Sequence, residues 1–158
     1  MSNTLNIKEQ RLGSVMQRYQ AAVDDFDREM ARLLGVNGTD LRCLEVLIGA
    51  EGEITPRIIA DRLGLTTGSV TTMLDRLERA GYLTRAPHPD DRRKVVVEAT
   101  GAARRRAWEM VGPLIEESAD AVTRDFTDAE LDVVEKFITR ATALQERHTA
   151  RLREAPAG

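Results

Sequence analysis

Two groups of polar side chains lie close together in the sequence and could bind a polyanion. The first group is small and hydroxyl-rich: Thr66, Thr67, Gly68, Ser69, Thr71 and Thr72. The second is a cluster of cations: Arg92, Arg93 and Lys94. Short side chains let a helix approach base edges closely, and the free amides at a helix N-terminus suit phosphate. These residue types predict noncovalent binding of nucleic acid.

Two short helices must position the hydroxyl-rich group. Thr55 and Pro56 form a helix start, an N-cap residue followed by proline, and Gly64 ends that helix. A second helix is predicted from Thr66 or Thr67 to Ala80, with Gly81 as its terminator. Two short helices joined by a tight turn are a helix-turn-helix unit.

The apolar pattern predicts which face of the second helix is exposed. With Val70 facing inward, Leu74 and Leu77 fall beside it, while Gly68 and Thr72 point outward with Asp75 and Arg79. Capping of the helix is the alternative explanation for the hydroxyls, but it accounts for one of them and not for the whole patch. We therefore predict that this patch contacts DNA.

A β-hairpin is predicted directly after the second helix. Residues 82–85 and 94–99 have strand patterns, and the turn between them is rich in Pro and Asp. A hairpin at this place is a wing, and its tip carries the cation cluster. Arg93, held by Asp91, is the candidate for the adjacent minor groove, whose negative potential attracts arginine. The alternative is a solvated run of charges on a loop.

The other arginines of this region each have two possible partners. Arg76 is predicted to reach a phosphate or a guanine edge, and its alternative is a weak surface pair with Asp75 or Glu78. Asp75 would repel DNA, so we expect it to orient Arg76 or another arginine. The run 104–106 is expected to be a solvated helix face or a distant phosphate contact.

The motif resembles the winged-helix regulators of the multiple-antibiotic-resistance (MarR) family. The matching pieces are Leu63-Gly64-Leu65, Ser69-Val70-Thr71, Leu74-Asp75-Arg76-Leu77-Glu78, Ala80-Gly81-Tyr82-Leu83, Pro89, Asp91-Arg92-Arg93 and Thr100. Two positions depart from the family pattern: His88 replaces the usual Asp, and Ala99 the usual Leu. The resemblance implies a DNA-binding role for Arg93, dimerisation through the N- and C-terminal helices, and binding of aromatic acids by some members.

Amphipathic helices flank the motif. Apolar residues at steps of three and four predict a long helix over 12–34, and Thr39 is expected to cap a second helix. Ile54 is expected to form a short strand that joins the wing. After Thr100, one helix over about 101–124 should kink at Gly112-Pro113, and a capping box at Thr127 and Glu130 starts the last helix.

The predicted fold is therefore mainly α: a winged helix-turn-helix unit with a small β wing, flanked by long dimerisation helices. We predict one domain over 1–158, with the DNA-binding unit at 39–100 and dimerisation helices at 5–36 and 101–152. A regulator of a symmetric operator needs two recognition helices, so a homodimer is expected.

Composition sets the class of protein. The 158 residues are 42% hydrophobic, with no apolar run long enough for a membrane span and no signal-peptide core. A cytoplasmic protein without a membrane partner is expected. The net charge is −3, but residues 57–106 hold 11 Lys and Arg against 6 Asp and Glu (+5), while the remainder holds 12 against 20 (−8). DNA responds to the local basic patch.

No catalytic, cofactor or metal motif is recognised. His88 and His148 lie far apart, and the single cysteine, Cys43, stands between inward-facing leucines, which favours a core thiol over a peroxide sensor. An enzyme is the second class considered, and no nucleophile motif, phosphate loop or metal constellation supports it. A pure protein-interaction module is the third, and the arginine-tipped wing and the hydroxyl-rich helix argue against it. The candidates for binding an aromatic acid are Tyr19, Arg42 and Trp108, each of which could instead pack in the core or lie on the surface.

The sequence thus predicts a dimeric, sequence-specific DNA-binding transcriptional regulator. Its partner is a double-stranded, pseudo-palindromic operator, from which a small ligand such as an aromatic acid releases a repressor. The operator, the regulated genes, the effector and the choice between repression and activation are left open.

Overall fold

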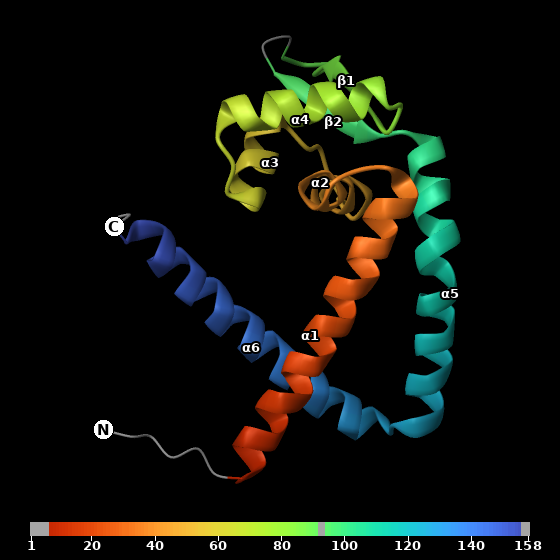
Figure 1. The fold of residues 1–158 in the computed structure, drawn as a ribbon, viewed down its shortest axis with the longest axis vertical. Helices are drawn as coiled ribbons and strands as arrows, with labels where there is room; N and C mark the ends of the chain where they lie inside the picture. Colours follow the sequence, from red (N-terminus) through yellow and green to blue (C-terminus); the bar gives the residue numbers. More distant parts are fainter. Residues whose placement is uncertain (1–6, 92–93, 156–158) are drawn as a thin grey trace. The chain divides into compact units, whose positions relative to one another are not determined.

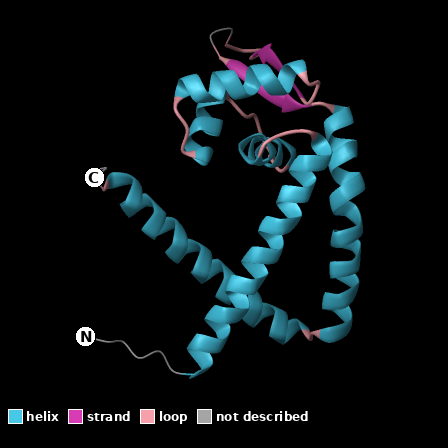
Figure 2. Ribbon diagram, in the orientation of Figure 1, coloured by secondary structure: helices cyan, strands magenta, loops and turns pink. Residues whose placement is uncertain are grey.

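A computed structural model of the chain describes residues 7–91 and 94–155. The described elements follow the order α1 (Ile7–Leu34), α2 (Gly38–Ile48), α3 (Pro56–Leu63), α4 (Thr67–Arg79), β1 (Leu83–Pro87), β2 (Val95–Ala99), α5 (Gly101–Asp125) and α6 (Asp128–Glu154). Figure 1 traces this order, and Figure 2 shows that helix predominates beside one small sheet. The predicted mainly helical winged fold is confirmed. The chain divides into two compact units, residues 1–110 and 111–158.

The helix-turn-helix forms where the sequence predicts it. Thr55 caps α3 by accepting a hydrogen bond from the Ile58 amide, and Pro56 is its first residue. Gly64 ends α3 with φ 66°, a left-handed conformation that glycine adopts without steric cost. Thr66 caps α4, and Gly81 follows it with φ 76°. Local capping chemistry therefore fixes both ends of both helices.

The wing is a two-stranded antiparallel hairpin. Its register places Leu83 opposite Ala99 and Pro87 opposite Val95, so β1 runs two residues beyond the predicted strand. The predicted strand at Ile54 is wrong. Ile54 makes a single bridge to the hairpin, in which the Val97 amide donates to the Ile54 carbonyl at 2.8 Å. Pairing stops there because the next residue is already the N-cap of α3.

The start of α2 differs from the prediction. Asn37, not Thr39, is the N-cap: its backbone is extended and its side chain accepts a hydrogen bond from the Asp40 amide at 2.9 Å. Thr39 therefore already lies in the first helical turn, where it cannot cap. Upstream, α1 begins at Ile7, before the apolar pattern becomes regular, and ends at Leu34, which Gly35 follows with φ 68°.

The core of the first unit lies where α2 and α4 pack with the end of α1 and the hairpin (Figure 1). Its side chains are almost all aliphatic, as the low aromatic content requires. The most deeply buried of them are Leu44, Leu47, Ile59, Val70, Met73, Leu74, Leu77, Leu83 and Val97. This core fixes the back of α4 and leaves its other face outside.

The second unit consists of the rest of α5 and of α6. Helix α5 continues through Pro113 without a break, and the predicted capping box of Thr127 and Glu130 is present at the start of α6. No residue of α6 is buried, although Val133, Phe137 and Leu144 lie along it. Among the described helices, none is long and apolar enough to cross a membrane.

Candidate nucleic-acid interface

The hydroxyl-rich start of α4 is fully exposed. Thr66, Thr67, Gly68, Ser69, Thr71 and Thr72 all have exposed side chains or backbone. The Thr66 hydroxyl accepts a hydrogen bond from the Ser69 amide at 3.2 Å and lies 2.9 Å from the Ser69 hydroxyl. Capping therefore occupies two members of the patch, and the other four stay available to a ligand.

Two of these threonines present a defined surface. The hydroxyl of Thr71 donates to the Thr67 carbonyl at 3.0 Å, and that of Thr72 donates to the Gly68 carbonyl at 3.1 Å. With their protons turned back to the helix, both side chains offer oxygen lone pairs and methyl groups outward. Such groups can accept from the amino groups of bases and contact the thymine methyl.

Gly68 has open space around it. A Cβ built on this residue would meet no atom of the protein within 4 Å. Packing within the chain therefore does not require glycine here, and its φ is not in the left-handed region. A glycine on an exposed helix allows another molecule to approach the backbone closely.

The buried face of α4 consists of Val70, Met73, Leu74 and Leu77. The sequence predicted three of these four, and Met73 was not assigned to either face. Four inward side chains over two turns hold the helix against the core and direct the hydroxyl patch outward.

An ion-pair network ties α4 to the wing. The Arg85 guanidinium lies 2.7 Å from Asp75 and 2.5 Å from Glu78, and the Arg85 amide also donates to Glu78 at 3.2 Å. Hydrogen bonds to Glu78 and Asp75 raise the pKa of Arg85, and hydrogen bonding to Arg85 lowers the pKa of Glu78. The arginine that Asp75 orients is thus Arg85. This pairing neutralises a carboxylate that would otherwise repel DNA.

Arg76 has a partner that the sequence did not suggest. Its Nε and Nη2 donate to the two carboxylate oxygens of Asp40 at 2.8 and 2.5 Å. The predicted alternative, a pair with Asp75 or Glu78, is therefore wrong. Asp40 lies 36 residues earlier, at the start of α2, so only the tertiary fold could reveal this contact.

The wing turn is organised by His88. Its Nδ1 accepts hydrogen bonds from the amides of Asp90 and Asp91 at 3.0 and 3.2 Å, while Nε2 lies 2.8 Å from Glu53. The aspartate usual in the family can accept amides in the same way. His88 thus replaces the aspartate as the hydrogen-bond acceptor for the turn amides, and it also contacts Glu53 in the loop before α3.

The tip of the wing is described in part. Lys94 donates its amide to the Asp91 carbonyl at 2.8 Å, and its Nζ lies 4.0 Å from the Asp91 carboxylate. Arg92 and Arg93 lie outside the described residues, so the predicted pairing of Asp91 with Arg93 stays a prediction. Asp91 nevertheless supports the turn through its backbone.

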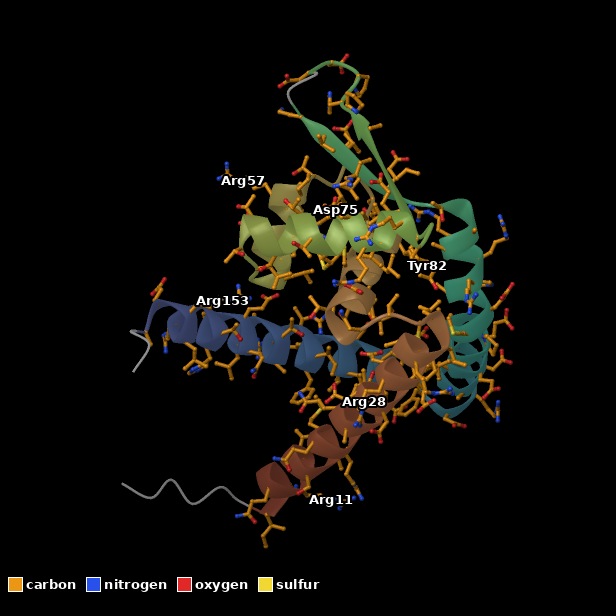
Figure 3. The ribbon with its side chains drawn as sticks, turned by 45° about the horizontal axis from the view of Figure 1, so that its top comes forward. Arg11, Arg28, Arg57, Asp75, Tyr82 and Arg153 are labelled. Carbon is orange, nitrogen blue, oxygen red and sulfur yellow. The ribbon has the colours of Figure 1, made fainter. Side chains whose placement is uncertain are left out.

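The start of α4 and the base of the wing share one surface. Thr66, Thr67 and Lys94 line the same hollow of about 870 Å³, together with Arg57. Arg57 is exposed and points away from α3 in Figure 3. Arg57 was not among the site residues predicted from the sequence. Its position in the first turn of the first motif helix is the feature that could have indicated it. The fold therefore brings hydroxyls and cations to one side of the winged unit.

Two arginines of α5 have a structural role that the sequence did not predict. Arg104 donates to the carbonyls of Ile48 and Leu47 at 3.2 and 3.4 Å, and Arg106 donates to the Leu33 carbonyl at 2.8 Å. The last carbonyls of a helix have no partner within it and attract cations. Arg104 and Arg106 thus cap α2 and α1 while both residues stay exposed. The predicted solvated helix face is therefore confirmed, and the distant phosphate contact stays a prediction.

The three ligand candidates are not brought together within the described unit. Arg42 lines a hollow of about 700 Å³ beside α1 and α2, whereas Tyr19 and Trp108 do not line it. Tyr19 is 63% exposed and Trp108 57% exposed, so the alternative of core packing is wrong for these two in a single chain. Arg42 lies on the surface, 3.7 Å from Glu45.

Cys43 is a core residue, as predicted. Its side chain is fully buried, and burial, followed by the nearby charge of Asp40, raises the pKa of its thiol to about 12. A thiol in this state does not form the reactive thiolate at neutral pH. In the described part of the chain, no cluster of His, Cys, Asp and Glu could hold a metal ion.

Comparison with known proteins agrees with this architecture. The sequence profile of the MarR family matches residues 34–94. HTH-type transcriptional regulator YcgE of Bacillus subtilis is 36% identical over 129 residues, which cover 82% of each chain. The chain belongs to the MarR family. It is a DNA-binding transcriptional regulator and not an enzyme.

Two further proteins are similar to this chain. HTH-type transcriptional repressor YetL of Bacillus subtilis is 28% identical over 66% of this chain and 62% of its own. The crystal structure of Streptococcus pneumoniae FabT in complex with DNA aligns with a TM-score of 0.64 at 24% identity, over 87% of this chain and 97% of FabT. The second likeness supports the fold.

Proposed function

We propose that this MarR-family protein is a homodimeric, sequence-specific repressor that a small aromatic acid releases from a pseudo-palindromic operator. The observation that carries the proposal is the surface shared by the start of α4 and the base of the wing. It joins exposed hydroxyls to Lys94 and Arg57. We assign residues 39–100 to DNA binding and 5–36 with 101–152 to dimerisation, within one regulatory domain.

DNA contact is proposed in two parts. Thr66, Thr67, Gly68, Ser69, Thr71 and Thr72 read base edges in the major groove from the start of α4. Arg92, Arg93 and Lys94 bind backbone phosphates or enter the adjacent minor groove. Cations at the wing supply affinity that depends on salt, whereas the small residues of α4 supply preference among sequences.

The proposed dimer seam is the apolar surface of the terminal helices. On α6, Val133 is 67% exposed and Leu144 50%; on α1, Leu12 is 45% exposed. Large exposed apolar patches on a single chain mark association surfaces. A second copy would cover them and place two α4 helices on one face of the duplex. The half-sites would then lie one helical turn, about 10–10.5 bp, or a multiple of it, apart.

The hollow beside α1 and α2 supports the ligand proposal. Arg28, Arg32 and Arg42 line it together with the apolar side chains of Ala31 and Leu41. Arginine pairs with a carboxylate in a bidentate manner, and an aromatic ring needs an apolar wall. Asp24 and Asp27 also line the hollow, and their negative charges oppose the binding of acids that carry more than one charge. Tyr19 and Trp108 do not line this hollow, so we do not assign them to it.

Release would follow from a change in the spacing of the two recognition helices. A coupling of about 1–3 kcal/mol between ligand and DNA lowers operator affinity by roughly 5- to 150-fold. Repression is proposed because the repressor YetL is similar over two thirds of this chain.

The experiment has two steps. The protein selects duplexes from a random pool, and fluorescence anisotropy measures affinity for the selected duplex and for a scrambled one. Salicylate and related phenolic acids are then titrated against the complex. We expect enrichment of an inverted repeat and release by at least one acid. Equal affinity for selected and scrambled duplexes would overturn the sequence-specific function. Release by no acid, with no saturable heat of binding, would overturn the ligand proposal alone.

A further inference from the structure

The most unusual polar contact of the winged unit joins α4 to α2. Arg76 and Asp40 meet side-on, through two hydrogen bonds of 2.8 and 2.5 Å. The carboxylate is almost completely buried, with 1% of its side chain exposed, while 46% of the Arg76 side chain is exposed. Bidentate pairs between arginine and carboxylate are strong and geometrically specific.

Asp40 is held in place by contacts that do not involve Arg76. Its amide donates to the N-cap Asn37 at 2.9 Å, and it lies in the first turn of α2, where the helix dipole favours a negative charge. The next residue, Leu41, is part of the core. The carboxylate is therefore a rigid anchor on the side of α2 that faces α4.

Arg76 occupies the corresponding place on α4. It lies one helical turn after the outward-facing Thr72 and between the buried residues Leu74 and Leu77. A guanidinium bound here resists rotation of α4 about its own axis, because rotation would separate it from a fixed carboxylate. If Arg76 bound a phosphate instead, the buried Asp40 carboxylate would lose its positively charged partner. The free-energy cost of that loss is much larger than the gain from one surface contact with a phosphate.

We propose that Asp40 and Arg76 are positioning residues for DNA recognition. The pair sets the rotation of α4, and Arg76 acts through Asp40 and not as a phosphate or guanine contact. The inference rests on the DNA-binding function proposed above, and it changes the role predicted for Arg76 from the sequence.

Substitutions at the two residues separate positioning from direct contact, because the two roles predict opposite effects. If Arg76 binds phosphate, Asp40→Asn frees the arginine and removes a negative charge, so affinity stays equal or rises. If the pair positions α4, Asp40→Asn lowers affinity for the selected duplex on the order of tenfold, as expected for loss of a charge-assisted hydrogen bond. The slope of log affinity against log salt stays unchanged, because no phosphate contact is lost.

Arg76→Lys is the second variant: the side chain at this position is 46% exposed, and a lysine still offers the buried Asp40 a positive charge. Lysine keeps the charge needed for a phosphate but cannot form the bidentate pair. We expect a loss similar to that of Asp40→Asn, and no further loss when the two are combined, because both break one interaction. Arg79→Lys is the matched control on α4. Arg79 is exposed and donates to the Asp75 carbonyl, and it pairs with no carboxylate among the described residues, so this variant should bind DNA as tightly as the parent.

Circular dichroism and sedimentation verify that every variant is folded and has the parent's oligomeric state at the assay temperature. Parental or higher affinity of Asp40→Asn would overturn the proposal, and so would parental affinity of Arg76→Lys. A parent that binds no duplex would instead contradict the proposed function. If Asp40→Asn fails to fold, Arg76→Lys decides alone.

Discussion

Gly68→Ala should make the protein more stable and its DNA binding weaker. An added Cβ meets nothing within 4 Å in the protein, and Gly68 is the second residue of α4 with φ outside the left-handed region. Replacing glycine by alanine in a helix stabilises it by about 0.5–1 kcal/mol. For a chain of this size, that gain raises the melting temperature by roughly 1–4 °C.

The same methyl group should obstruct DNA. Specific interfaces are packed as densely as protein interiors, and an extra methyl in a packed site costs about 1–3 kcal/mol. Affinity for the selected duplex should therefore fall by roughly 5- to 150-fold, which fluorescence anisotropy measures directly. Thermal unfolding of the same sample shows that the loss does not come from the fold.

Gly38→Ala is the matched control. Gly38 is the first residue of α2, and a Cβ there also meets nothing within 4 Å. It should gain similar stability and keep the parent's affinity. If Gly68→Ala is stabilised and still binds the duplex as tightly as the parent, the start of α4 does not approach DNA, and the proposed reading surface is wrong.

Four further outcomes are expected. Native Cys43 should resist alkylation. The free energy of unfolding should also fall as the pH rises from 9.0 toward about 12, because in this range the thiol ionises only in the unfolded state. Urea titrations at several pH values measure this fall. Phe137→Asp should dissociate the dimer in sedimentation, since an unpaired charge in a seam costs several kcal/mol. Arg93→Ala should reduce the slope of log affinity against log salt by about one. His88→Asn should keep DNA affinity, whereas His88→Leu, which lacks an acceptor for the turn amides, should lower it in anisotropy assays.

Each of these outcomes has a contrary result. Rapid alkylation of Cys43 in the native state would contradict its core assignment. Lys136 is an exposed neighbour of Phe137, so Lys136→Asp should leave the dimer intact. If Phe137→Asp and Lys136→Asp both dissociate the dimer, or if neither does, the dimer seam does not lie at Phe137. An unchanged salt slope for Arg93→Ala would remove the wing tip from the interface. Equal affinity of both His88 variants would show that the turn does not depend on the side chain.

Local chemistry made much of the fold predictable. The caps at Thr55, Thr66 and Thr127 and the terminators Gly64 and Gly81 act within one helical turn, so spacing alone located those helix ends. The N-cap of α2 was missed because Asn37 and Thr39 are both good caps, and the backbone conformation decides between them.

Long-range polar contacts were not predictable. The partners of Arg76, Arg85, Arg104 and Arg106 are carboxylates and carbonyls that only the packed fold brings near. The sequence showed many arginines in the motif, and it predicted a DNA contact for Arg76 without indicating a partner within the protein. In the structure, some of these arginines form ion pairs or cap helices, whereas Arg57 is exposed and lines the hollow at the start of α4.

The most direct test of the central claim is a hydroxyl-radical footprint of the protein on its selected duplex. A dimer that reads DNA through two α4 helices and two wings should protect two half-sites related by a two-fold axis, with centres about 10–10.5 bp or a multiple of that apart. Outer protections in the minor groove should disappear for Arg93→Ala. A single protected site bound by one chain, or uniform protection without a repeat, would contradict the claim that this protein is a dimeric, sequence-specific regulator.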